Sequence, residues 1–412
     1  MQPHTITGID IGNATVKVAI ARVRPGAAGP ELIGIGGSSS TSGLDGGEIV
    51  DVQETVSNVR SALLAASTMA GIPIRRAWVG VSGVHVAMQS SRGVIAVGRA
   101  DQEIGEADVK RVIDAAAAVS LPPNRELIHV IPREFIIDDS EHVHDPIGMK
   151  GVRLEADVTL VHGPSRHLRN LAKVVNECGV EVAGFVFAPL AASLASVDKH
   201  QKQFGVAHLD VGGGTCSLTV WEKGDLLHAA ILPLGSVHIT RDLAIMLRTS
   251  LDVAERIKTE LGVINEPIDR RRKPEAVDLT AYMDEPYQVS RRDLLRVLDA
   301  RADEMLEMVA AELKKCGRAG KLPAGVVVSG GGSKLNGILP LVRDGLGLPV
   351  RGHRLLGVEA SEAGLDPSLA VAAGLILWEY NHDAGEAGSS ISSLPIAGWM
   401  RRAGSWLKNF LP

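Results

Sequence analysis

Cysteine is scarce in this chain, which has only three among 412 residues: Cys178, Cys216 and Cys316. They lie far apart in the sequence, form no CxxC pair and match no zinc-ligand spacing. Their odd number also argues against a disulfide scaffold. We therefore expect reduced thiols with structural roles.

Long hydrophobic runs and an excess of positive charge are also missing. No apolar stretch approaches the ~20 residues that a membrane-spanning helix needs, and residues 1–5 do not resemble the start of a secretory signal. Lys and Arg number 43 against 48 Asp and Glu, and the net charge of −5 argues against a nucleic-acid partner. The 45% hydrophobic and 22% charged residues indicate a folded, multidomain protein with a cytosolic main body.

Two distant segments share one pattern, Gly8–Ile20 and Leu209–Val220. Each is typical of a short apolar strand, an Asp-x-Gly turn and a second strand with period-two alternation. Asp10 and Asp210 are separated by 200 residues. This separation favours a duplicated domain over a short-period repeat.

The glycine-rich turns of these segments are candidate phosphate-binding loops. Glycine lets successive backbone N–H groups approach an anion, and two facing turns would clamp a polyphosphate. Asp10 and Asp210 need a cation between them and phosphate, so we expect Mg²⁺, held partly through water. A single Asp-x-Gly is as typical of an ordinary turn as of a phosphate-binding loop, but the occurrence of two favours a phosphate-binding site. Further candidate phosphate contacts are Asn13, Thr15, Lys17 and Thr215.

A third glycine cluster follows another apolar strand, in Gly325–Lys334. It is either a strand-to-helix turn or a place where a flat ligand such as adenine approaches the backbone. Glu255 and Lys258 share one face of a helix that is predicted to begin near Asp252. They are a candidate partner for the same ligand, and the alternative is an exposed ion pair.

Hydrophobic periodicity predicts four main helices and one long strand. One helix is expected to bury Val52, Val56, Val59, Leu63 and Leu64 on one face, and a Gly-, Ser- and Asp-rich linker is expected from Asn381 to Pro395. The predicted helices span 50–70, 106–119, 166–178 and 291–316, and the strand spans 127–137.

The three glycine clusters, in this order, resemble the actin-like ATPase superfamily. Four shorter stretches resemble one family within it, the bacterial cell-division proteins of the FtsA type. They are Leu234–Ala244 followed by Ala254-Glu255-x-x-Lys258, Val81–His85, His129–Phe135, and the tail around Gly398–Met400 and Ser405–Leu407.

This resemblance implies an α/β, actin-like fold with two lobes, duplicated core domains, an inserted small α+β subdomain and a C-terminal amphipathic helix. The first lobe would comprise residues 1–83, 163–197 and about 357–382, and the inserted subdomain 84–162. The second lobe would comprise 198–356, with a small subdomain at about 231–300, followed by a linker at 383–395 and a membrane-targeting helix at 396–412.

The resemblance also implies ATP and Mg²⁺ as cofactors. The nucleotide-binding residues would be Asp10, Gly12, Asn13, Thr15 and Lys17 in the first loop and Asp210, Gly212, Gly213, Gly214 and Thr215 in the second, with Asp242, Glu255, Lys258, Gly331, Gly332 and Ser333 near the nucleoside. Several relatives carry a glutamate that activates water at the position of Ala188, and alanine cannot do so. At most slow ATP turnover is therefore expected, with the nucleotide acting mainly as an assembly switch.

By the same resemblance the protein would polymerise and would contact other division proteins through residues 84–162. Arg301 and Glu304 match an Arg-x-x-Glu pattern that binds the C-terminal peptide of the tubulin-like protein FtsZ. The alternative for this pair is a solvated i,i+3 ion pair.

Residues 396–411 form an amphipathic pattern when plotted at helical spacing. Trp and Lys or Arg suit the headgroup region of an anionic membrane, so a reversible anchor at the inner face of the cell membrane is predicted. The alternative is a helix docked on the protein's own core. The candidate membrane-binding residues are Trp399, Met400, Arg401, Arg402, Trp406, Leu407, Lys408 and Phe410.

Two other functions remain open at this point. One is a soluble sugar or metabolite kinase of the same superfamily, although no catalytic carboxylate paired with a substrate pocket is evident. The other is an actin-like scaffold of pilus assembly, which would lack a separate linker and membrane helix.

Overall fold

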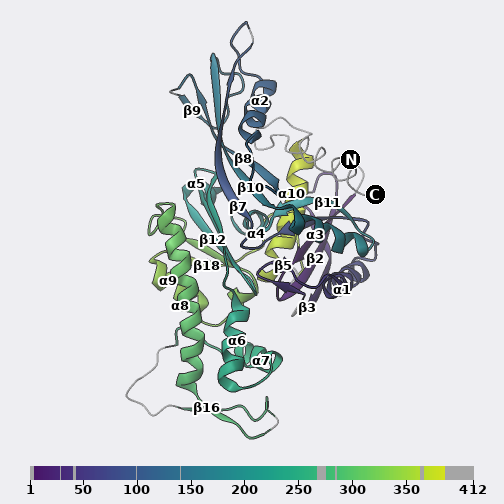
Figure 1. The fold of residues 1–412 in the computed structure, drawn as a ribbon, viewed down its shortest axis with the longest axis vertical. Helices are drawn as coiled ribbons and strands as arrows, with labels where there is room; N and C mark the ends of the chain where they lie inside the picture. Colours follow the sequence, from purple (N-terminus) through teal and green to yellow (C-terminus); the bar gives the residue numbers. More distant parts are fainter. Residues whose placement is uncertain are drawn as a thin grey trace.

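The computed structural model describes residues 4–27, 29–39, 43–98, 100–139, 141–266, 275–283, 285–361 and 366–385. Figure 1 shows two α/β lobes side by side, with a sheet-rich extension at one end and a helical extension at the other. The predicted tail helix and most of its linker lie outside the described residues. Within the described residues, no helix is both long enough and apolar enough to cross a membrane.

The first lobe is built on a five-stranded sheet of order β11-β6-β1-β2-β3. Its first two strands form an antiparallel hairpin, and β6 and β11 continue the sheet in parallel. Helices α1 and α3 cover one face, and α4 and α10 pack against the other. The elements are β1 (His4–Ile11), β2 (Thr15–Val23), β3 (Glu31–Ser39), β6 (Arg76–Val81), β11 (Glu181–Phe187), α1 (Val52–Ala70), α3 (Ser165–Glu177), α4 (Ala188–Ser196) and α10 (Ala370–Gly385), with the short β4 (Leu44–Asp45) and β5 (Glu48–Ile49).

The second lobe repeats this topology in its sheet, β14-β13-β12-β17-β18. Again the first two strands form a hairpin, and the next two, β17 and β18, add in parallel beside the first. The duplication predicted from the two Asp-x-Gly segments is therefore confirmed. The elements are β12 (Val206–Val211), β13 (Cys216–Glu222), β14 (Asp225–Leu232), β17 (Val326–Ser329), β18 (Val350–Gly352), α5 (Lys199–Phe204), α9 (Ile338–Leu346), and the 3-10 helices η1 (Gly331–Lys334) and η3 (Pro367–Leu369).

The helical extension grows out of the second lobe between β14 and β17 (Figure 1). Three helices pack around one apolar core that continues into the sheet of this lobe. They are α6 (Ser236–Leu247), α7 (Leu251–Leu261) and the long α8 (Arg291–Lys315), with the short strands β15 (Ala276–Asp278) and β16 (Gln288–Ser290) at the tip.

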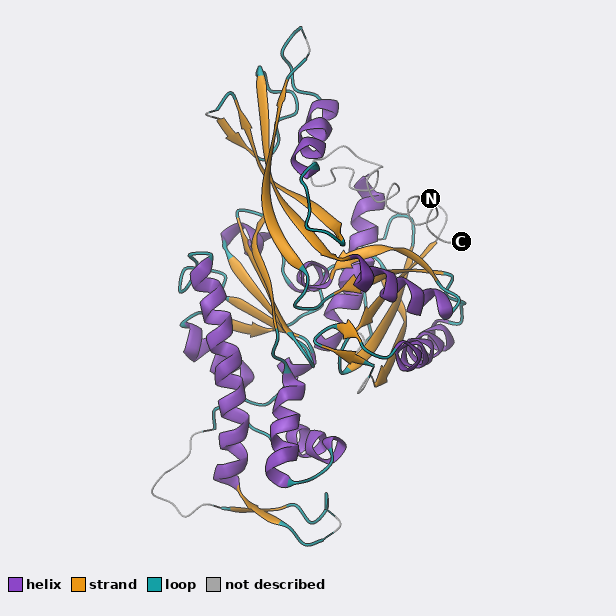
Figure 2. Cartoon of the chain, in the orientation of Figure 1, coloured by secondary structure: helices purple, strands orange, loops and turns teal. Residues whose placement is uncertain are grey.

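The inserted domain is an antiparallel sheet of order β7-β10-β8-β9 with one helix, α2, against one face (Figure 2). Val109, Val112 and Ala116 of α2 share a buried core with Leu154 and Val158 of β10. Side chains alternate across a strand, so the opposite face of β10 is polar. The elements are β7 (Ala87–Ala96), α2 (Glu106–Ala117), β8 (Arg125–Ile137), β9 (Glu141–Val143) and β10 (Arg153–Pro164).

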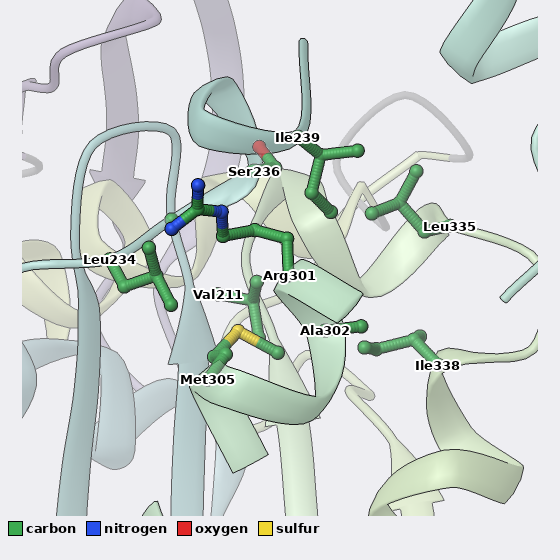
Figure 3. A pocket seen from close by; sticks show the side chains of 10 residues that line it. Val211, Leu234, Ser236, Ile239, Arg301, Ala302, Met305, Leu335 and Ile338 are labelled. Carbon is green, nitrogen blue, oxygen red and sulfur yellow. The ribbon is translucent and has the colours of Figure 1, made fainter. Parts of the chain in front are cut away.

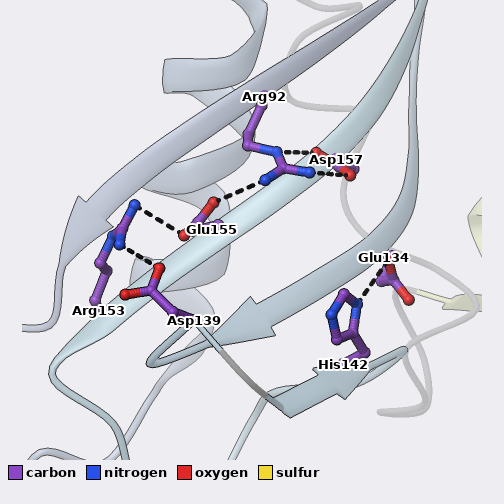
Figure 4. A network of polar contacts seen from close by, with 7 residues as sticks. All are labelled: Arg92, Glu134, Asp139, His142, Arg153, Glu155 and Asp157. Atoms are coloured by element: carbon purple, nitrogen blue, oxygen red, sulfur yellow. Dashed lines mark hydrogen bonds and ion pairs between the residues drawn. The ribbon is translucent and has the colours of Figure 1, made fainter.

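Charged side chains cross-link this open face (Figure 4). Arg92 binds Asp157 through two nitrogens at 2.6 and 2.8 Å, and its Nη1 lies 3.4 Å from Glu155 Oε2. Arg153 reaches Glu155 at 2.9 Å and also pairs with Asp139. Glu155 is buried between the two guanidinium groups, so its charge is compensated on both sides.

The four predicted helices and the predicted strand are all present, and their ends agree with the prediction to within two residues. Leu64 was expected on the buried face of its helix, but it is 66% exposed. The buried face of α1 includes Leu63 and Ala66, and Leu64 lies beside it, toward solvent. The predicted linker was expected to start at Asn381, whereas α10 continues through Gly385. The three cysteines are free, as expected.

Candidate functional site

The two Asp-x-Gly hairpins adopt the same turn in both lobes. The N–H of Gly12 donates to the Thr15 carbonyl at 3.2 Å, and the N–H of Gly212 donates to the Thr215 carbonyl at 3.0 Å. In each case the first strand ends one residue after the aspartate, at Ile11 or Val211, and the glycine opens the turn. Thr15 and Cys216 begin the second strands. The duplicated sequence thus produces a duplicated loop.

The two loops touch each other where the lobes meet. A Cβ on Gly213 would lie 2.5 Å from the Ala14 Cβ, and a Cβ on Gly214 would lie 2.5 Å from the Asn13 amide. Both distances are too short for any side chain, so glycine is required for the lobes to approach. Asn13, predicted as a phosphate contact, therefore lies directly against the second loop.

Asp10 and Asp210 lie at corresponding positions of the two facing hairpins and are close enough to repel each other. Burial, and secondly the charge of Asp210, raise the pKa of Asp10 to about 7, while Lys17 opposes this shift. Burial also raises the pKa of Asp210, and a hydrogen bond from Ser329 opposes it. Two carboxylates destabilised in this way favour a cation between them.

These residues fit a magnesium–nucleotide pair better than a metal bound by protein alone. Among the described residues, no group of three or more His, Cys, Asp or Glu side chains could hold a metal ion. Mg²⁺ usually takes only one or two carboxylates and completes its shell with water and phosphate. The paired carboxylates and the side-chain-free backbone of the loops match that requirement.

The third glycine cluster separates into glycines with different roles. A Cβ on Gly330 would lie 2.4 Å from the Val211 carbonyl oxygen, and one on Gly332 would lie 2.4 Å from Val211 Cγ1. Both glycines are therefore required for packing against β12. A Cβ on Gly331 would meet nothing within 4 Å, which leaves open space for close approach of a ligand. The Ser333 hydroxyl donates to the Gly330 carbonyl at 2.7 Å and closes the turn.

Lys258 is 3% exposed. The alternative of an exposed ion pair with Glu255 is therefore wrong, because the lysine of the pair is buried. Its amino group donates to Glu255 at 2.7 Å, to the Thr240 hydroxyl at 2.9 Å and to the Ser236 carbonyl at 3.2 Å. Burial lowers the pKa of Lys258, and Glu255 opposes the shift. Lys258 thus joins α7 to the first turns of α6.

The start of α6 is in turn attached to the second loop. The N–H of Ser236 donates to the Gly212 carbonyl and that of Val237 to the Gly213 carbonyl, both at 2.9 Å. Lys258 therefore supports the loop through Ser236, a contact that sequence spacing could not show.

Asp242, which was expected near the nucleoside, pairs with Arg301 on the side of α6 that faces α8. Nε and Nη2 of Arg301 both approach Asp242 Oδ2 at 2.8 Å, and Nη1 lies 2.6 Å from Glu304 Oε2. Asp242 therefore belongs spatially with the Arg301–Glu304 pair. The sequence pattern missed this grouping because Asp242 and Arg301 are 59 residues apart.

A small, mainly apolar pocket lies between the second loop and Arg301 (Figure 3). Figure 3 shows the Arg301 guanidinium between Leu234 and Ser236, with Met305 below it and Leu335 and Ile338 on the opposite wall. The pocket is lined by Val211, Leu234, Gly235, Ser236, Ile239, Arg301, Ala302, Met305, Leu335 and Ile338.

Comparisons with known proteins agree with this architecture. Residues 83–162 match the family described as "SHS2 domain inserted in FTSA", and residues 207–374 match "Cell division protein FtsA". The chain is 36% identical to the cell division protein FtsA of Bacillus subtilis, over 89% of this chain and 82% of that protein. It is 33% identical to the protein of the same name from Pseudomonas aeruginosa, over 98% and 97% of the two chains.

Solved structures show the same fold at lower identity. A chain of the PilM–PilN type IV pilus biogenesis complex aligns with a TM-score of 0.61 at 18% identity, covering 90% of this chain and 98% of that one. MreB5 of Spiroplasma citri bound to ADP aligns with a TM-score of 0.55 at 14% identity, covering 94% and 99%. Two actin-like lobes with an inserted SHS2 domain, together with these relatives, place the chain in the FtsA family of cell division proteins.

Proposed function

We propose that this protein binds ATP, polymerises on the inner face of the cell membrane at the division site, and tethers the FtsZ ring to that membrane. One observation carries the proposal that the protein binds ATP. It is the pair of glycine loops that touch each other, each of which follows a strand with a carboxylate near its end, Asp10 in one and Asp210 in the other. The two lobes, the inserted domain, the linker and the tail helix would have the limits expected from the sequence.

ATP would be held by the two loops, with Mg²⁺ bound through water by Asp10 and Asp210. The metal would neutralise phosphate charge, and Lys17 would add a further positive charge. Gly331 offers open backbone beside the second loop, which suits a nucleoside. In support, MreB5 of Spiroplasma citri, which shares the fold, has been solved bound to ADP and to AMPPNP.

The nucleotide would act mainly as an assembly switch. Ala188 is the first residue of α4 and is buried, and its methyl group cannot orient or activate water. Slow turnover by the purified protein is the expected result. Substantial turnover that Asp210→Ala abolishes would contradict this part of the proposal.

The FtsZ C-terminal peptide would bind at Arg301, Glu304 and the adjoining Asp242. The Arg301 side chain is 28% exposed, so part of it remains accessible to a partner. An acidic peptide group would then share or replace Asp242 as its partner. Arg301→Ala should weaken peptide binding at least tenfold while ATP affinity is kept; Arg296→Ala, on an exposed part of the same helix, is the control.

The membrane anchor is proposed from the sequence of residues 396–412, which lie outside the described residues. One short amphipathic helix binds reversibly, and polymerisation would multiply such anchors into firm attachment. The inserted domain, residues 84–162, would contact neighbouring copies and other division proteins.

Co-sedimentation with anionic liposomes tests the whole proposal. The full chain with ATP should pellet and carry FtsZ with it, whereas a chain ending at Pro395 should remain in the supernatant. Trp406→Glu should release the protein from liposomes without changing ATP affinity, and Ser405→Glu, on the polar face, is the matched control for added charge. If neither chain pellets, the tail packs on the protein body and the tether is refuted.

A further inference from the structure

The carboxylate of Asp210 is held from behind by a buried serine. Asp210 and Ser329 are direct neighbours in the parallel pairing of β12 and β17, so their side chains share one face of the sheet. The Ser329 hydroxyl lies 2.7 Å from Asp210 Oδ1, and Ser329 is completely buried. This bond fixes one carboxylate oxygen.

A histidine holds the serine in turn. His208 lies two residues before Asp210, on the same face of β12, and its Nε2 is 2.9 Å from the Ser329 oxygen. Ser329 has one proton, and the carboxylate accepts it. The serine oxygen must therefore accept a hydrogen bond from His208 Nε2–H, which assigns the tautomer of this buried ring.

The duplicated fold supplies an internal comparison, because the first lobe lacks this arrangement. Gly8 and Ile9 of β1 pair with Trp78 and Val79 of β6, so the next position opposite Asp10 is Gly80, which has no side chain. Within the described residues, no side-chain hydrogen bond to Asp10 occurs. One carboxylate of the site is thus fixed by the protein, and the other is not.

We infer that Ser329, oriented by His208, is a positioning residue for Asp210. It occupies Oδ1 and prevents rotation of the carboxylate, which leaves Oδ2 directed to the water shell of a bound Mg²⁺. Asp210 would be the preset half of the cation site, and Asp10 would adopt its position when the cation binds. This inference rests on the proposed nucleotide function.

A second serine–histidine pair nearby provides a matched control. The Ser196 hydroxyl, at the end of α4, donates to the Ala192 carbonyl at 2.6 Å and lies 2.9 Å from His353 Nδ1. It is buried like Ser329 but has no bond to either aspartate. Ser196→Ala therefore removes a similar buried pair without touching Asp210.

The test measures the affinity of the full-length protein for a fluorescent ATP analogue, with saturating MgCl₂ and with EDTA. Wild-type protein should bind more tightly with Mg²⁺. Ser329→Ala should reduce the gain from Mg²⁺ about tenfold, the usual effect of one charge-assisted hydrogen bond, and leave the affinity in EDTA unchanged. Ser329→Thr, which keeps the hydroxyl, and Ser196→Ala should both retain the wild-type gain.

The possible results distinguish a failure of the role inferred for Ser329 from a failure of the proposed nucleotide binding. If the Ser329→Ala protein keeps the full gain from Mg²⁺, or loses affinity equally in both conditions, Ser329 supports the loop without positioning Asp210 and the inference is overturned. If Ser329→Ala fails to fold, His208→Leu, which removes the Nε2–H donor, must show a smaller loss of the same kind, and a full gain from Mg²⁺ in that variant overturns the inference. If the wild type binds no nucleotide at all, the proposed function itself fails.

Discussion

Acid should destabilise this protein through histidines that are buried in the neutral form, and His129 is one of two whose pKa burial lowers to about 3. It lies on β8 where the inserted domain meets the first lobe, and it is 1% exposed. Its Nε2 accepts a hydrogen bond from the N–H of Phe187 at 2.9 Å, directly before α4, and its ring lies 4.8 Å from that of Trp378 on α10. Burial, and secondly His382, lower the pKa of His129 to about 3.

The direction in which pH changes the unfolding free energy follows from proton linkage. The pKa is near 6.5 in the unfolded chain and lower in the folded one, so the stabilisation is complete above pH 6.5 and is lost as the pH falls toward 3. At pH 5 the unfolded state has already gained about 2 kcal/mol from protonating this one residue. His167, which is 4% exposed with a pKa lowered to about 4, adds a similar amount. Together they approach the whole stability of a marginal domain.

Urea unfolding followed by tryptophan fluorescence at pH 7, 6 and 5 measures this loss. His129→Gln keeps an acceptor for the Phe187 N–H but cannot be protonated. Between pH 7 and pH 5 the variant should therefore lose about 2 kcal/mol less unfolding free energy than the wild type. Parallel pH dependences in the two proteins would refute the argument, because they would show that His129 takes up no proton on unfolding.

Two further predictions concern the second lobe. Gly332→Ala should lower the melting temperature, because its Cβ would lie 2.4 Å from Val211 Cγ1, whereas Gly331→Ala should leave the melting temperature unchanged and weaken ATP binding; calorimetry and a binding titration separate the two, and equal melting temperatures would contradict the packing argument. Lys258→Met should cost about 2 kcal/mol, because the Thr240 hydroxyl and the Ser236 carbonyl lose a charged donor, whereas Glu255 is 46% exposed and is left to water; urea unfolding measures this loss, and a loss below about 1 kcal/mol would show that the lysine is not needed for folding.

The parts of the fold that the sequence predicted depend on local patterns. The Asp-x-Gly turns between alternating strands and the 25-residue helix α8 each follow from residues within a few turns or strand lengths of one another. Leu64 shows the limit of such patterns. Hydrophobic spacing cannot define where a buried face ends, because that depends on which element packs against the helix.

The candidate site required contacts that no local pattern contains. Ser329 and Asp210 are separated by 119 residues and meet only because β17 adds beside β12. The glycine cluster was predicted as one ligand-binding feature, yet Gly332 is required for packing and Gly331 is open. The presence of glycine in the sequence cannot by itself distinguish a packing role from a ligand-binding role.

Helix α6 connects the separate parts of the site. Its N-terminus is bonded to the second glycine loop through Ser236, its first turns to Lys258 of α7 through Thr240, and its following turn to Arg301 of α8 through Asp242. The glycine loop fixes where the helix begins, and a short helix moves as a rigid unit. The position of Asp242 beside Arg301 therefore depends on the geometry of the second glycine loop, so the proposed nucleotide-binding and the proposed partner-binding residues share one structural support.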